Sequence, residues 1–215
     1  MGIIQELQAE IINPDSDINN ILRKALLVSH KLQLTEFEKW IKNELNGYST
    51  TDDLPEFRQN IKGQLKYINP FHGWCPIQVE TTKYENFLTT RYITQSVPQL
   101  LALIKDSKGT LSMKLPPEIE RSLWKDSFCP AMETYLVFDK SIFANIIEQV
   151  KTNLLNWVLL LEDQGISGDS VSFSISEKEK AKNSQIINNY QTNIFGDLNR
   201  SQLQQGTNES QQTSN

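Results

Sequence analysis

Apolar residues recur at three- and four-residue intervals along residues 17–48, and this period predicts two consecutive amphipathic helices. The apolar positions of the first helix are Ile18, Ile21, Leu22, Ala25, Leu26, Val28 and Leu32. Those of the second helix are Phe37, Trp40, Ile41 and Leu45. Because only residues 33 and 34 separate the two patterns, we predict an antiparallel helical hairpin.

The ends of the second helix also have sequence signals. Thr35 stands three residues before Glu38, the spacing of a capping box, so Thr35 is the predicted N-cap. Asn46-Gly47 is the predicted end, because glycine adopts the left-handed conformation that closes many helices. Trp40 falls on the apolar stripe between these ends, and we predict that it belongs to the core.

The remaining pattern alternates between short helices and short strands. Further helices are predicted at residues 3–12, from Ser96 to Gly109, after Pro116, and at residues 141–163. Strands are predicted at residues 59–68, 76–79, 110–115 and 133–139, whereas residues 84–93 fit both states. Since no strict strand-helix-strand repeat is present, the pattern predicts an α+β fold. In this fold the N-terminal helical hairpin and the long C-terminal helix pack with a small sheet of short strands, followed by a polar tail.

A group of residues at the end of the second helix and after it forms a recognisable pattern: Glu44, Leu45, Asn46, Gly47, Tyr48, Leu54, Pro55, Phe57 and Arg58. This pattern resembles the opening of the AbiTii domain. The resemblance covers about residues 1–165. It implies a setting of phage defence, in abortive infection and toxin-antitoxin contexts, and it supplies no catalytic residues.

Composition divides the chain into three parts. Residues 1–165 contain all four tryptophans and form the predicted globular domain. Residues 166–182 are a predicted linker because of their glycines and charges, with a short strand at residues 171–175. Residues 183–215 are rich in Asn, Gln, Ser and Thr, which favours disorder.

An alternative for this tail is self-association through stacked β-strands, because Asn and Gln ladders with few charges suit in-register stacking. The candidate residues are Ile194, Phe195, Gly196, Leu198, Leu203, Gln204, Gln205 and Gly206.

The net charge and the N-terminal residues bear on the binding partners and on the location of the protein in the cell. The net charge of −5 argues against a general binder of nucleic acid or of anionic membranes. The N-terminal residues lack a basic region and a long apolar core, and no apolar run approaches the length that spans a bilayer. We therefore expect a cytoplasmic protein. Two cysteines are too few for a disulfide framework, and we expect reduced thiols.

Catalytic signatures are sparse. His30 and His72 have no second metal ligand at helical spacing, so we expect no metal site and no cofactor. Only Asp106-Ser107-Lys108 has the acid and lysine spacing of a metal-dependent nuclease, and its position at a helix end favours a capping role. Together with the defence setting that the resemblance implies, these observations predict a non-enzymatic module that acts through a protein partner or a homo-oligomer. The alternative is a toxin or effector enzyme that acts on nucleic acid, which is the less favoured partner.

Overall fold

The computed structural model describes residues 2–79, 82–107, 109–125, 131–169 and 172–182. The chain divides into two compact units. One unit combines residues 1–41 with residues 151–215, and the other is the continuous segment 42–150. The boundaries fall inside two helices, α3 (Thr35–Asn46) and α7 (Lys140–Asp163).

The first unit is helical. It contains α1 (Ile3–Ile12), α2 (Ile18–Leu32), the first part of α3, the last part of α7, and α8 (Ile175–Ala181). The predicted helices at residues 3–12, 17–48 and 141–163 are confirmed. The core is built from the apolar stripes of these helices and includes Ile4, Leu7, Leu22, Val28, Phe37, Trp40, Leu154 and Trp157. Trp40 is only 1% exposed, as predicted.

The connection between α2 and α3 differs slightly from its predicted form. Gln33 has φ 60° and ends α2, and the Leu34 N–H donates to Ser29 O at 3.0 Å. The Leu34 C=O then accepts the Glu38 N–H at 2.9 Å. Thr35 is therefore the first residue of α3 and not its N-cap, because the left-handed turn at Gln33 starts the next helix one residue early.

Residues 166–169 and 172–182 carry more structure than their composition indicates. Ile166 is buried, and α8 begins at Ile175, inside the predicted strand 171–175. The Glu177 carboxylate accepts N–H groups from Ser167 at 3.0 Å and from Gly168 at 2.9 Å, and it closes a capping box with Ser174. Glu177 thus joins the turn after α7 to the start of α8.

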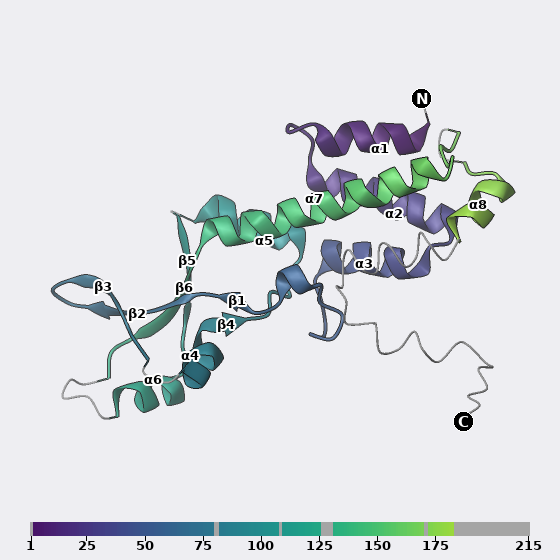
Figure 1. The fold of residues 1–215 in the computed structure, drawn as a ribbon. Coiled ribbons are helices and arrows are strands. Elements are labelled where there is room, and N and C mark those ends of the chain that lie inside the picture. The colour runs from purple at the N-terminus through teal and green to yellow at the C-terminus, as the bar shows by residue number, and fades with distance from the viewer. Residues whose placement is uncertain (1, 80–81, 108, 126–130, 170–171, 183–215) are drawn as a thin grey trace, which may run out of the picture. The chain divides into compact units, whose positions relative to one another are not determined.

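The second unit contains the sheets (Figure 1). Its helical elements are η1 (Glu56–Arg58), α4 (Thr82–Thr89), α5 (Val97–Asp106), α6 (Pro117–Trp124) and the first part of α7. Its strands are β1 (Ile61–Lys62), β2 (Gln64–Asn69), β3 (Gly73–Pro76), β4 (Thr90–Arg91), β5 (Thr110–Lys114) and β6 (Thr134–Asp139). The larger sheet is antiparallel with the order β3-β2-β6-β5, and β1 pairs with β4. The α+β class is confirmed.

Gly63 explains why the predicted strand 59–68 becomes two strands. Its N–H donates to Thr89 O at 2.8 Å, beside the pairing of β1 with β4. A Cβ atom at Gly63 would lie 2.8 Å from Leu136 Cδ1 and 2.9 Å from Phe138 Cε1. Only glycine therefore fits here without a shift of β6 side chains, and the chain changes partner from β4 to β6 at this point.

Two other assignments change in the structure. The strand predicted at residues 76–79 lies earlier, because β3 pairs with β2 in a hairpin and ends at Pro76. Residues 84–93, which fit both states, divide between α4 and β4.

The two faces of the larger sheet have different surroundings. Leu65, Thr134, Leu136 and Phe138 are buried on one face. Trp124 of α6 packs edge-on against Tyr67 on this face, with ring centroids 5.1 Å apart, and its Nε1 donates to Thr134 Oγ1 at 3.0 Å. The strand register places Ile68, Trp74 and Tyr135 on the opposite face.

Candidate functional site

Three of the residues that carry the family resemblance, Glu44, Tyr48 and Arg58, form a buried hydrogen-bonded group. Glu44 and Arg58 are both fully buried. Arg58 Nε donates to Glu44 Oε1 at 3.1 Å, and Arg58 Nη2 pairs with Glu44 Oε2. Tyr48 Oη donates to Glu44 Oε1 at 2.6 Å. The arginine Nη1 donates to two backbone oxygens, those of Ile93 at 3.2 Å and Gln95 at 2.8 Å.

This arrangement holds the end of α3, the loop to η1 and residues 93–95 together. Gly47 allows the close approach, since it has φ +94° and a Cβ atom there would lie 3.2 Å from Thr94 O. The guanidinium is hydrogen-bonded on three of its nitrogens, and both carboxylate oxygens of Glu44 accept hydrogen bonds. A pair that is closed to solvent and satisfied in this way stabilises a fold and leaves no group for chemistry.

The tip of the β2–β3 hairpin has the opposite character. Phe71 is 91% exposed, the highest value among the large apolar side chains that the structure describes. The turn that carries it is ordered by Asn69, whose Oδ1 accepts the N–H groups of Phe71 at 2.8 Å and His72 at 3.1 Å. Gly73 closes the turn with φ +70°. The phenyl ring is therefore presented to solvent by an organised turn.

Two further apolar side chains belong to the same hairpin. Ile68 and Trp74 are direct cross-strand partners, and both are exposed. The Trp74 ring packs edge-on against Tyr135 with centroids 5.2 Å apart. Ile68, Phe71 and Trp74 are called the hairpin patch below. The sequence signal for it was present as a phenylalanine inside the turn Asn-Pro-Phe-His-Gly, but the pattern predicted only a turn there.

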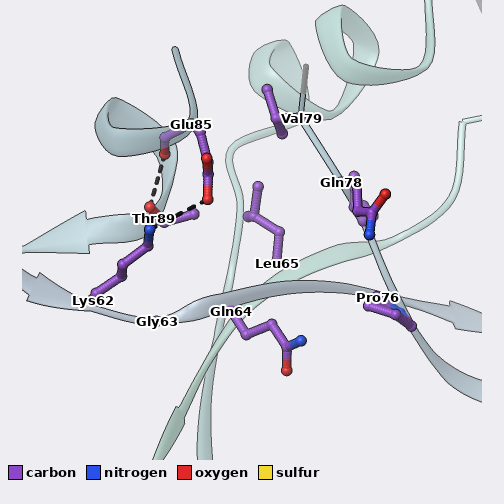
Figure 2. Close-up of a pocket in the computed structure, with 10 residues that line it drawn as sticks. Lys62, Gly63, Gln64, Leu65, Pro76, Gln78, Val79, Glu85 and Thr89 are labelled. Atoms are coloured by element: carbon purple, nitrogen blue, oxygen red, sulfur yellow. Dashed lines mark hydrogen bonds and ion pairs between the residues drawn. The ribbon is translucent and has the colours of Figure 1, made fainter. Parts of the chain in front are cut away.

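A groove of about 540 Å³ lies between β2 and α4 (Figure 2). Its charged lining residues are Lys62 and Glu85, which form an ion pair at 3.3 Å. Thr89 Oγ1 donates to the Glu85 backbone oxygen at 2.8 Å. This groove therefore offers one exposed ion pair that already neutralises itself, with Leu65 and Val79 beside it.

A second groove of about 230 Å³ runs along β5. It is lined mostly by apolar side chains of β5, α5, the β4–α5 segment and the β6–α7 junction, and Arg91 is the one lining residue that carries a charge at neutral pH. The Arg91 guanidinium Nη1 donates to Phe87 O at 3.3 Å, Leu88 O at 3.1 Å and Thr90 O at 2.7 Å. Burial lowers the pKa of Arg91 from its ordinary value.

The structure describes only some of the residues that the sequence singled out for chemistry or self-association. The candidate self-association residues 194–206 and Lys108 of the Asp106 motif lie outside the described residues. His30 Nδ1 lies 3.2 Å from Glu38 Oε2, and His72 lies in the hairpin turn of the other unit. Within the described ranges, no group of three or more His, Cys, Asp or Glu side chains is placed to hold a metal ion. None of the described helices has the length and apolarity needed to cross a membrane.

The comparisons with known proteins agree with the resemblance in the sequence. No curated protein and no solved structure matches the chain. The AbiTii family model matches residues 2–186, a range that includes all of the unit 42–150 and most of the other unit. The chain therefore belongs to the AbiTii family, which associates it with abortive infection, a form of phage defence.

Proposed function

We propose that this protein is a non-enzymatic phage-defence module that acts in the cytoplasm by binding a protein partner through the hairpin patch. The observation that carries this proposal is the exposure of Phe71 on an ordered turn, in the same hairpin as the exposed Ile68 and Trp74. Large aromatic side chains that enter a partner's pocket dominate the energy of many interfaces. A preorganised turn adds to affinity because little conformational freedom remains to be lost on binding.

The charge of the hairpin indicates which charge the surface of the partner should carry. Between residues 61 and 79 the sequence contains Lys62 and Lys66 and no carboxylate, in a chain with a net charge of −5. Lys62 is paired with Glu85, which leaves Lys66 next to the patch in strand β2. The partner that fits is a protein with an apolar pocket for Phe71 and a neutral or acidic rim.

A phage-protection assay tests this function. Host cells that express the full chain are challenged with phage, and Phe71→Ser is compared with Phe87→Ser. Phe87 is a suitable control because it is 68% exposed on α4 and lies outside the patch. We expect Phe71→Ser to lose protection at unchanged protein level and thermal stability, while Phe87→Ser keeps it. Equal protection by wild type and Phe71→Ser would remove the hairpin patch from the function.

Direct contact is tested by a photo-reactive phenylalanine placed at position 71 in the full chain. We expect a discrete crosslinked protein in infected cells, and we expect the same group at position 87 to give none. A crosslink to nucleic acid at position 71, in place of protein, would contradict the proposal.

The alternative function is a toxin or effector enzyme that acts on nucleic acid. It is tested by incubating the purified chain with RNA and DNA plus Mg²⁺ or Mn²⁺ and measuring cleavage. Cleavage that is abolished by Asp106→Ala would replace the binding function with a nuclease function.

A further inference from the structure

The outer edge of β5 is unpaired in the described part of the chain. β5 is the last strand of the sheet order, and within the described residues β6 is its only strand partner. The Leu115 N–H donates to Thr134 O at 2.9 Å, and the Lys140 N–H donates to Gly109 O at 3.1 Å. In an antiparallel pair the peptide groups point to the partner at every second residue. The N–H and C=O groups of Thr110, Ser112 and Lys114 therefore point away from β6.

The apolar groove of about 230 Å³ adjoins this edge. Leu111 and Met113 line it on the face that also carries Phe138. Ser112 lines it as well, although its side chain belongs to the opposite face, so the groove reaches the edge of the strand. Met113, Leu103 and Tyr92 are all exposed around the groove. An open strand edge and an open apolar groove thus lie side by side.

These two features define the chemistry of the occupant. Alternating donors and acceptors along a strand edge are matched by the backbone of another extended polypeptide, and alternate side chains of that strand fall on one face. A strand added to β5 would place every second side chain next to Leu111 and Met113, within reach of the groove.

Arg91 adds a charge preference. It is the only residue charged at neutral pH among those that line the groove, and its Nη1 is held by three backbone oxygens at the end of α4 and in β4. A guanidinium has N–H groups on Nε and Nη2 as well, and two of these fit a carboxylate in a bidentate manner. The charge complement of the groove is therefore an acidic residue.

We propose that β5 and its groove bind an extended segment of a partner protein, with apolar residues at alternate positions and a carboxylate for Arg91. The segment adds a fifth strand to the sheet at the edge opposite β3. This surface is separate from the hairpin patch and does not depend on the function proposed for it.

The probe is a library of synthetic peptides of about seven residues, a usual strand length. Alternate positions carry Val, Ile, Leu or Phe, the intervening positions carry Thr or Ser, and one end carries Asp. The library is applied to the immobilised full chain, and retained peptides are measured in solution. We expect bound peptide to slow amide hydrogen exchange at Ser112 and Lys114. N-methylation of alternate peptide nitrogens should weaken binding about tenfold, because it removes the backbone hydrogen bonds to β5.

Matched variants locate the site. Met113→Glu is expected to weaken binding about tenfold, whereas Leu159→Glu should leave it unchanged. The two positions are comparable because Met113 is 41% exposed and Leu159, in α7, is 43% exposed. Exchanging the peptide Asp for Lys should weaken binding to the wild type about fivefold and leave binding to Arg91→Gln unaffected. A circular dichroism melt of each variant checks that it is folded.

Four results would each overturn the inference. The first is that the immobilised chain retains no peptide, and the second is that Leu159→Glu and Met113→Glu weaken peptide binding equally. The third is that N-methylation leaves peptide binding unchanged. The fourth is that the free protein forms a dimer that Met113→Glu dissociates. The last result would show a second copy of this chain on the β5 edge.

Discussion

Arg58 and Glu44 form an ion pair with neither side chain exposed to solvent, and the two residues are separated by fourteen positions in sequence. Tyr48 completes the group through its hydroxyl, and its ring lies under the guanidinium carbon at 5.3 Å from the centroid. Glu44, Tyr48 and Arg58, three of the residues that carry the resemblance, thus hold the fold together. For this reason the family signature can be recognised in the sequence without revealing an active site.

The first prediction concerns this pair. Arg58→Met leaves the Glu44 carboxylate buried without its charged partner, and it should lower the free energy of unfolding by about 3–5 kcal/mol. The double variant with Glu44→Leu should recover part of this loss, because no unpaired charge then remains. Urea denaturation measures both.

The control for this pair is Arg121→Met. Arg121 forms an exposed ion pair with Glu118 at 3.6 Å, so its loss should cost less than about 1 kcal/mol. If the two arginine variants were equally stable, the buried pair would not be a main support of the fold.

The second prediction concerns Trp40 in the helical unit. Its ring lies 5.1 Å from that of Phe37, which in turn stacks on Trp157 with centroids 3.9 Å apart. Trp40→Ala should cost about 3–5 kcal/mol, because the cavity that it leaves is enclosed by packed rings. Trp74→Ala should cost much less, since Trp74 is 50% exposed. Unchanged thermal stability of Trp40→Ala would place Trp40 outside the core.

The third prediction compares two glycines with similar backbone conformations. A Cβ atom at Gly73 (φ +70°) would have no other atom within 4 Å, whereas a Cβ atom at Gly168 (φ +64°) would lie 2.8 Å from Phe173 Cε1 and 2.9 Å from Ile3 Cγ2. Gly73→Ala should therefore cost about 1 kcal/mol, from backbone strain alone. Gly168→Ala should cost a further ~1–3 kcal/mol from overpacking. Equal melting temperatures for the two variants would show that the packing around Gly168 adjusts without cost.

The fourth prediction concerns pH. Burial acts to raise the pKa of Glu177, but the N–H groups of Gly168, Ser174 and Ser167 and the Ser174 hydroxyl outweigh it and lower this pKa to about 2. Since the folded pKa lies below the ordinary value of 4.5, Glu177 stabilises the fold fully above pH 4.5, and this contribution is lost as the pH falls toward 2.

The measurement for Glu177 is the difference in melting temperature between wild type and Glu177→Gln as a function of pH. This difference should be largest at neutral pH and should shrink as the pH falls below 4.5. The subtraction removes the contribution of other carboxylates that titrate in the same range. A difference that stays constant with pH would contradict the role assigned to this carboxylate.

The fifth prediction concerns the tail. If residues 183–215 self-associate, the isolated segment should gain β structure at raised concentration, because each chain supplies the backbone pairing that one chain lacks. Leu203→Lys should block this by placing like charges at the roughly 4.8 Å strand spacing, and Gly206→Pro should remove a corner. Sedimentation and thioflavin binding measure the effect. A peptide that stays soluble and unstructured at millimolar concentration would leave only a linker or partner-docking role.

Helical periodicity predicted α1, α2, α3 and α7 well, because their apolar stripes are local features of the sequence, whereas α8 was not predicted. The capping box of Ser96 and Gln99 at the start of α5 is a further case in which the signal lies within one turn. The sheet was less predictable. Gly63 interrupts a strand for a reason that lies in β6, more than seventy residues away, and no local pattern contains that information.

The two candidate surfaces could not be predicted from the sequence either, because they also depend on residues that are distant along the chain. Phe71 and Met113 are residue types that usually belong to a core. They are exposed to solvent here because of the turn at Asn69 and the strand register of β5. Trp74 is a further example, because this large aromatic side chain is 50% exposed. Hydrophobicity identifies residues that prefer burial, but the fold decides which of them are left for a partner.

The division of the helical unit between residues 1–41 and the segment after residue 150 has a consequence for synthesis on the ribosome. The chain emerges from its N-terminus, so α1 and α2 leave the ribosome long before Trp157, the residue that stacks on Phe37. The continuous segment 42–150 has all of its residues available earlier. The sheet-containing unit can therefore fold first. Until the segment after residue 150 has been synthesised, part of the apolar face of the N-terminal helices stays exposed to solvent. Exposed apolar surface favours aggregation, so any aggregation of the growing chain is expected mainly in that interval.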